Sequence, residues 1–252
     1  MVSTPSAKHR VSARPAQCKK PADSPLIELR NVCKTYYLGG EKTRSGAQVP
    51  ALRGVNLVIR RGEFVAIMGP SGSGKSTLMN CVGALDLPSE GSILLDGKDI
   101  AGLSESDLAT VRGQKIGFVF QNFNLIQSLT AYENAELPLL FQDIDEDERR
   151  ARLDALFARV GLSERQNHKP TELSGGEQQR VAFVRALAVN PELILADEPT
   201  GNLDSRAGAE IMALLKELNE EGKTIVVVSH DPGVVHYARR VVRLKDGEIV
   251  SQ

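Results

Sequence analysis

A glycine-rich stretch at residues 69–77, GPSGSGKST, carries the most readily identified chemistry in this chain. This stretch, the P-loop, fits the pattern G-x-x-x-x-G-K-[ST], whose glycines let backbone N–H groups surround a polyphosphate while the lysine adds positive charge. The hydroxyl that follows the lysine, on Ser76, is a natural ligand for Mg²⁺. The residues predicted to bind the nucleotide are Gly69, Ser71, Gly72, Gly74, Lys75, Ser76 and Thr77. The P-loop therefore predicts a nucleoside triphosphate site.

Two adjacent carboxylates, Asp197 and Glu198, follow an apolar run at residues 193–196. A short continuous apolar run is typical of a strand that is covered on both faces. In an open α/β sheet, ligands collect at the carboxyl ends of such strands. That position would bring Asp197 close to Ser76 as a second partner of Mg²⁺, and it would leave Glu198 free to act as a general base on an attacking water.

Residues 173–180, LSGGEQQR, form the most specific string in the chain. Ser174 and Glu177 fit a capping box, which fixes the N-terminus of a helix. Gly175 and Gly176 leave that terminus bare, so its N–H groups can approach an anion. One subunit has little use for two anion sites on one nucleotide. Two copies packed head to tail would each complete the site of the other.

The elements around these motifs follow from the apolar pattern. Residues 63–68 predict a buried strand before the P-loop, and the spacing of Leu78, Cys81, Val82 and Leu85 predicts a helix after it. Further strands are predicted at residues 26–29, 55–59, 92–95, 116–120, 193–196, 224–228, 241–244 and 248–250. The first three of these are expected to form an antiparallel layer, and the last two a hairpin.

Helices are predicted between residue 122 and about residue 189. Thr130 and Glu133 form a capping box, and Leu153, Leu156, Phe157 and Val160 form an apolar helical stripe that Gly161 ends. A crossover helix with Ile211, Leu214, Leu215 and Leu218 ends near Gly222. The predicted fold is α/β, a P-loop NTPase core with an antiparallel β subdomain and a helical subdomain inserted at about residues 122–189. Residues 25–252 form this domain.

Composition limits the class of protein. The formal net charge of -1 gives no basic footprint for nucleic acid, and no apolar run approaches the ~20 residues that span a bilayer. Cys18, Cys33 and Cys81 lack disulfide or C-x-x-C spacing and suggest reduced thiols in a cytosolic protein. Residues 1–24 are basic and rich in Ser, Ala and Pro; a disordered tail is favoured over a transit peptide.

The chain from Leu26 onward resembles the ATP-binding-cassette (ABC) ATPases. LSGGEQQR resembles the signature motif of that family, and residues 201–204, GNLD, resemble the segment that contacts the partner across the dimer. By the same resemblance, Tyr36 is the aromatic residue that stacks on adenine. Gln121 matches the glutamine at the mouth of the helical subdomain, and His230 matches the switch histidine.

The resemblance implies hydrolysis of ATP to ADP and phosphate. The implied catalytic residues are Glu198 as general base, Lys75 at the phosphates, and Gln121 and His230 as sensors of the γ-phosphate. The implied Mg²⁺ ligands are Ser76, Gln121 and Asp197, and the residues for the nucleotide of the opposite copy are Ser174, Gly176 and Asp204. The implied partners are a second copy of the chain and a membrane permease. The protein would then lie on the inner face of the cell membrane.

Within the family, the chain is most similar to the subunits that serve lipoprotein-release and macrolide-export permeases (LolD/MacB-like). The alternative is an ABC ATPase that transmits force to cell-envelope enzymes without transport. Soluble ABC proteins of translation or repair and P-loop GTPases fit less well, because the chain has one cassette, no coiled coil and no N-K-x-D string. Phe123, Leu125, Ile126 and Leu129 are either a docking groove for the permease or core packing.

Overall fold

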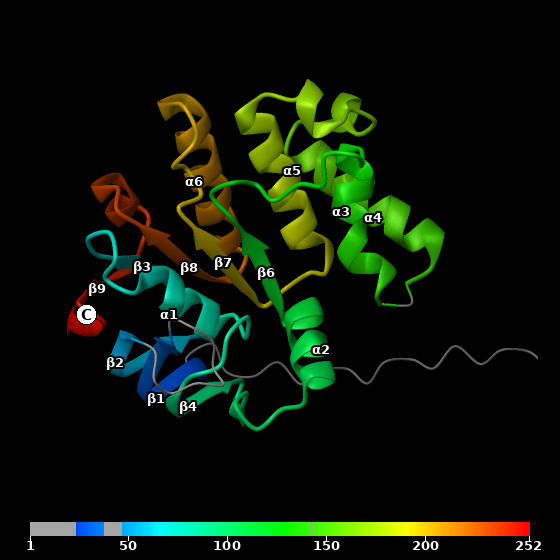
Figure 1. Cartoon of the computed structure of the whole chain (residues 1–252). Helices are drawn as coiled ribbons and strands as arrows, with labels where there is room; N and C mark the ends of the chain where they lie inside the picture. Colours follow the sequence, from blue (N-terminus) through cyan, green and yellow to red (C-terminus); the bar gives the residue numbers. More distant parts are fainter. Residues whose placement is uncertain (1–23, 38–46, 143) are drawn as a thin grey trace, which may run out of the picture.

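The computed structural model describes residues 24–37, 47–142 and 144–252 (Figure 1). The predicted basic tail, except for Ser24, lies outside the described residues. In the described part of the chain, no helix is both long enough and apolar enough to cross a membrane.

A six-stranded sheet forms the centre of the molecule, with the spatial order β10-β9-β3-β8-β7-β6. Its strands are β3 (Phe64–Met68), β6 (Ile116–Val119), β7 (Leu193–Asp197), β8 (Thr224–Ser229), β9 (Arg240–Lys245) and β10 (Glu248–Ser251). All neighbouring strands are parallel except β9 and β10, which pair as the predicted hairpin. Every residue of β3 and β8 is buried, as the continuous apolar runs predicted.

Alternate residues of the central strands pack into two different cores. In β3, Val65 and Ile67 pack with helix α1 (Lys75–Val82) and the antiparallel layer. The residues between them, such as Ala66, pack on the opposite face of the sheet against helix α6 (Ser205–Glu220). The sheet is therefore covered on both sides, and only the ends of its strands remain open for ligands.

The predicted antiparallel layer is a four-stranded sheet with the order β2-β1-β4-β5. Its strands are β1 (Pro25–Tyr37), β2 (Gln48–Arg60), β4 (Glu90–Leu95) and β5 (Lys98–Asp99). The strands β1 and β2 are much longer than the sequence predicted, and they pair over most of their length. Helix α1 lies between this layer and the central sheet (Figure 1).

Three helices share a third core, separate from the two beside the sheet. They are α3 (Ala131–Leu140), α4 (Glu146–Arg159) and α5 (Gly175–Ala188), with the short 3₁₀ turns η1 (Ser163–Arg165) and η2 (Pro170–Glu172) between the last two. Figure 1 shows α3 and α4 grouped beside α5, away from the antiparallel layer. These elements fall within the range that the sequence assigned to a helical insertion. Another turn, η3 (Pro232–His236), follows β8.

Two details of the helices differ from the sequence prediction. Helix α1 ends at Val82, so Leu85 is not part of it and is exposed. Helix α2 (Glu105–Lys115) was not predicted; Ser104 caps it by accepting from the Asp107 amide, and Leu108 is its one buried residue. With one buried position there is no apolar stripe to reveal a helix.

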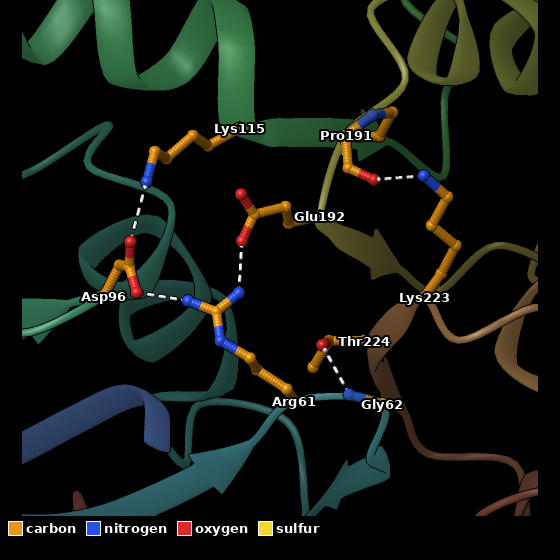
Figure 2. Close-up of polar contacts among 8 residues, drawn as sticks. All are labelled: Arg61, Gly62, Asp96, Lys115, Pro191, Glu192, Lys223 and Thr224. Carbon is orange, nitrogen blue, oxygen red and sulfur yellow. Dashed lines mark hydrogen bonds and ion pairs between the residues drawn. The ribbon is translucent and has the colours of Figure 1, made fainter. Parts of the chain in front are cut away.

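Ion pairs join the antiparallel layer to the central sheet at the amino ends of its parallel strands (Figure 2). The guanidinium of Arg61 contacts Asp96, which follows β4, and Glu192, which precedes β7. Lys115 Nζ, from the end of α2, lies 3.1 Å from the other oxygen of Asp96. Arg61 and Asp96 are largely buried, so this cluster fixes the two sheets relative to each other.

Candidate active site

A cavity of about 650 Å³ opens beside the P-loop, at the carboxyl ends of β3, β7 and β8. The lining residues that the sequence singled out are Ser71, Gly72, Gly74, Lys75, Ser76, Thr77, Gln121, Glu198 and His230. Val49, Pro50 and Ala51 of β2 also line it, although nothing in the sequence pointed to them. The long strand β2 thus brings the antiparallel layer to the rim of the cavity.

The P-loop presents backbone amides to this cavity. Gly72 and Gly74 adopt positive φ angles of 76° and 99°, which favour glycine. Gly74 caps α1 without any side-chain hydrogen bond to the first turn, so the N–H groups at the helix start remain available to an anion. Gly69 does not line the cavity; a Cβ there would lie 2.1 Å from the Leu244 carbonyl oxygen, so this glycine permits close packing against β9.

Lys75 is buried, and its ammonium group donates to the carbonyl oxygens of Gly69 and Pro70, each at 2.9 Å. An ammonium group has three protons, so one donor remains for a phosphate oxygen. The two backbone contacts hold the charge over the loop and limit the motion of the long side chain. This arrangement places a fixed positive charge at the anion site.

Asp197 ends β7 with an oxygen that has no partner. Its Oδ1 atom is buried and makes no hydrogen bond within the described part of the protein. Burial raises the pKa of this carboxyl group, while a hydrogen bond with the Ser76 hydroxyl and the charge of Lys75 oppose the rise. An unpaired carboxylate oxygen next to a hydroxyl is a donor set that suits Mg²⁺.

Glu198 and His230 contact each other at the ends of β7 and β8. His230 Nδ1 lies 2.9 Å from Glu198 Oε1, and the Glu198 amide donates to the Val228 carbonyl at 2.8 Å. Glu198 has a φ of 44°, an unfavourable left-handed conformation for a residue other than glycine. This turn directs the backbone away from the strand immediately after Asp197. The carboxylates of Asp197 and Glu198, although adjacent in sequence, are therefore held in different surroundings.

Gln121 follows β6 and is held against the segment after Glu198. Asn202 Nδ2 donates to the Gln121 carbonyl and to Asn122 Oδ1, each at 3.0 Å. A Cβ at Gly201 would lie 2.8 Å from Gln121 Nε2, so only glycine fits there without displacing that amide. The loops that carry Gln121 and Glu198 thus contact each other directly.

The predicted residues of the string at 173–180 lie in a different place. Ser174 caps α5, and the complete capping box with Glu177 is present as predicted. Ser174, Gly176 and Asp204 line a second cavity of about 290 Å³, and none of the three lines the first. Asp204 caps α6 by accepting from the Arg206 and Ala207 amides. One copy of the chain therefore contains two separate candidate anion surfaces.

Tyr36 lies near the rim of the first cavity but is not among its lining residues. Its ring is partly exposed, and its cross-strand partner in β2 is Val49, which does line the cavity. The Tyr36 hydroxyl donates to Asp86 Oδ2 at 2.9 Å. Burial and this contact raise the pKa of Tyr36.

An apolar groove of about 750 Å³ opens between α2, β6, α3 and α5. It is lined by Leu85, Phe118, Phe120, Leu137, Pro138, Phe141 and other residues, and Phe141 is almost fully exposed. None of the four residues predicted for a docking groove lines it. Leu125 is buried in the helical core, with Phe123 packed against the same core, whereas Ile126 is exposed. For Leu125 and Phe123 the structure supports the packing interpretation.

Comparisons with known proteins are consistent with this site. Residues 52–201 match the family model described as ABC transporter. An uncharacterized ABC transporter ATP-binding protein of Methanocaldococcus jannaschii, MJ0796, is 54% identical over 229 residues, which is 89% of this chain and 95% of that protein. The macrolide export ATP-binding/permease protein MacB of Escherichia coli is 50% identical over 226 residues. That match covers 90% of this chain and 34% of MacB, so the chain spans about a third of MacB.

Solved structures show the same similarity. A dimeric structure of the MJ0796 ATP-binding cassette, in a post-hydrolysis state bound to ADP and Pi, has a TM-score of 0.81 and 51% identity, and covers 89% of this chain and 97% of that one. CbiO1 of Clostridium perfringens, part of the CbiONQ transporter complex, has a TM-score of 0.79 and 33% identity. The match covers 91% of this chain and 88% of the CbiO1 chain.

Proposed function

The chain belongs to the ABC transporter family, and we propose that it is the ATP-hydrolysing subunit that drives a separate membrane permease of the macrolide-export or lipoprotein-release type. The observation that carries the proposal is the first cavity. It gathers the P-loop, Gln121, Glu198 and His230 from four separate segments of the chain. The similarity to MacB and to MJ0796 over most of the chain supports the branch.

In this proposal the phosphates of ATP bind the P-loop amides and Lys75, and adenine stacks on Tyr36. Ser76, Asp197 and the Gln121 amide oxygen would hold Mg²⁺, which would neutralise charge on the phosphates. This donor set is small: among the described residues, no group of three or more His, Cys, Asp or Glu is arranged to hold a metal. A Mg²⁺ ion that is also bound by phosphates requires few ligands from the protein.

Glu198 accepts the proton of the attacking water, whose oxygen bonds to the γ-phosphorus while the bridging oxygen leaves with ADP. Lys75 stabilises the negative charge that spreads over the phosphate oxygens, and it needs no reorganisation because its backbone contacts already fix it. The contact with His230 orients the Glu198 carboxylate toward the cavity.

A second copy of the chain completes the site. Ser174, Gly176 and Asp204 lie on the second cavity, so they would bind the nucleotide of the opposite copy in a head-to-tail dimer. The MJ0796 cassette, which is similar over 89% of this chain, is dimeric with ADP and Pi bound. ATP would join the two copies and hydrolysis would release them.

The permease is proposed to dock on the apolar groove. MacB joins an ATP-binding part and a permease in one protein, and this chain matches only a third of it. The groove is bordered by Asn124, close behind Gln121, and by Arg185, which donates to the carbonyls of Phe123 and Asn124. A partner in the groove would thus contact the loop that follows Gln121. This partner would hold the protein on the cytoplasmic face of the membrane.

The test separates chemistry from binding. Glu198→Gln keeps the size of the side chain and its hydrogen bonding but removes the proton acceptor, so ATP hydrolysis should fall by roughly 10²-fold or more. With Mg²⁺ and ATP the variant should run as a dimer on gel filtration, whereas the wild type with ADP should run as a monomer. Lys75→Ala is the matched control, since it should neither bind ATP nor dimerise. Near-normal hydrolysis by Glu198→Gln would show that the catalytic carboxylate is misassigned.

A further inference from the structure

A hydrogen-bonded cluster surrounds Tyr36, and the mechanism above does not use it. Asp86 accepts the Tyr36 hydroxyl on Oδ2 at 2.9 Å, and it accepts Lys34 Nζ on Oδ1 at 2.5 Å. The Leu87 amide also donates to Oδ1, at 2.8 Å. Both oxygens of this carboxylate are therefore engaged. Despite partial burial, these contacts keep the pKa of Asp86 below its usual value, so it is ionised at neutral pH.

Asp86 is attached to the helix that follows the P-loop. The amides of Leu85 and Asp86 both donate to the carbonyl of Asn80 in α1, at 2.9 and 3.2 Å. The start of the same helix presents its amides to the first cavity. The hydroxyl of Tyr36 is thus held by the C-terminal side of the helix whose N-terminus faces the proposed phosphates. This places the ring and the anion site in a fixed relation.

Lys34 holds the ring from another side. Its Nζ atom lies 5.1 Å from the centroid of the Tyr36 ring and also donates to the Leu87 carbonyl at 2.8 Å. The Lys34 side chain is mostly buried, so a cation over the ring is partly desolvated, where such contacts are strongest. Tyr36 as a whole nonetheless stays 38% exposed, which leaves surface for another planar group.

We propose that Asp86, braced by Lys34, is a positioning residue that fixes the Tyr36 ring for the base of the nucleotide. The inference rests on the proposed stacking of adenine on Tyr36. A ring with a free hydroxyl must lose rotational freedom when the base arrives, whereas a ring held by a charge-assisted hydrogen bond has already lost it. The contact therefore determines how much of the affinity for ATP comes from the base.

The experiment compares the dissociation constants of Mg–ATP and of Mg²⁺ with inorganic triphosphate, which has no base. Tyr36→Ala should weaken ATP binding by roughly 10-fold or more, because base stacking is lost, and leave triphosphate binding unchanged. Tyr36→Phe, which keeps the ring, and Asp86→Asn should each weaken ATP binding by about 3- to 10-fold, again with triphosphate unchanged. The double variant should be no worse than the single ones. The control is Tyr132→Phe, because the Tyr132 ring is stacked on Phe157 in the helical core, outside the cluster around Tyr36.

Different results overturn different statements. If Tyr36→Ala leaves the ratio of the two constants unchanged, adenine does not stack on Tyr36, and the inference fails with that assignment. If Tyr36→Ala raises the ratio of the Mg–ATP constant to the triphosphate constant while Tyr36→Phe leaves that ratio unchanged, stacking is correct and positioning by Asp86 is wrong. Asp86→Asn leaves Lys34 without its anion, so thermal unfolding is measured as well. If that variant is unstable, Tyr36→Phe decides alone, because it preserves the Asp86–Lys34 pair.

Discussion

His230 Nδ1 lies 2.9 Å from Glu198 Oε1, so an exposed imidazole holds the carboxylate proposed as the general base. The His230 side chain is 67% exposed and the Glu198 side chain only 21%. The two residues follow adjacent parallel strands, and the Glu198 amide is bonded to the Val228 carbonyl of the second strand. This accessible contact therefore helps to orient the carboxylate.

His230→Ala should lower the turnover of ATP by roughly 10-fold or more and leave ATP affinity within about 2-fold, since the P-loop is untouched. Steady-state hydrolysis and equilibrium binding measure the two effects. His236→Ala, in the exposed turn η3, should change neither. Equal loss in both variants, or loss of ATP binding with His230→Ala, would contradict the positioning of Glu198 by His230.

Arg61 should matter for stability because it joins the two sheets (Figure 2). Its side chain is 17% exposed and contacts Asp96 and Glu192, so Arg61→Leu would leave two carboxylates with fewer partners. We expect a loss of about 1–3 kcal/mol in the free energy of unfolding, measured by chemical denaturation.

The control for Arg61 is Arg206, which pairs with Glu210 but is 91% exposed. Arg206→Leu should change the free energy of unfolding by less than about 0.5 kcal/mol, because exposed ion pairs contribute little. If the two variants lose equal stability, the Arg61 cluster does not brace the junction between the sheets.

The sequence predicted those parts of the fold whose signals are local. Strand β8 is buried along its whole length and has the continuous apolar run that such burial requires. The capping boxes of Thr130 and Ser174 each involve residues three apart, so they could be identified without the tertiary structure. Helix α2 begins with a similar pair three residues apart, Ser104 and Asp107, but Leu108 is its one buried residue, so no apolar stripe marks it as a helix.

The sequence could predict the parts of the candidate site that lie in one continuous segment, but not the contacts between residues that are far apart along the chain. The P-loop is a single stretch, whereas Asp86 meets Lys34 across 52 residues of sequence and Tyr36 across 50. The left-handed backbone of Glu198 arises from its place beside β8, and no residue preference indicates it. Likewise, Val49 reaches the cavity because β2 extends beyond its apolar part.

The ionisation of Cys81 should lower the free energy of unfolding at alkaline pH. Burial raises the pKa of this thiol from an ordinary value near 9.0 to about 11. Between these values the unfolded chain releases the proton and the folded protein keeps it, so the free energy of unfolding decreases as pH rises. Relative to Cys81→Ala, the wild type should lose about 1 kcal/mol between pH 8 and pH 10, measured by urea denaturation. An equal difference at both pH values would show that the folded thiol titrates normally.

Gly176 tests the role of the second cavity in the dimer. A negative charge there would face the phosphates of the opposite nucleotide, so Gly176→Asp should prevent ATP-driven dimerisation and lower hydrolysis by roughly 10-fold or more. Binding of ATP to the P-loop of the same copy should be unchanged, because Gly176 does not line that cavity.

Two control variants separate charge from crowding. A Cβ at Gly176 would lie 3.2 Å from that of Ala207, so Gly176→Ala measures the effect of crowding alone. Gly102→Asp adds the same charge where a Cβ meets nothing within 4 Å, and it should behave as wild type. Normal dimerisation of Gly176→Asp, or weakened ATP binding by its monomer, would contradict the head-to-tail arrangement.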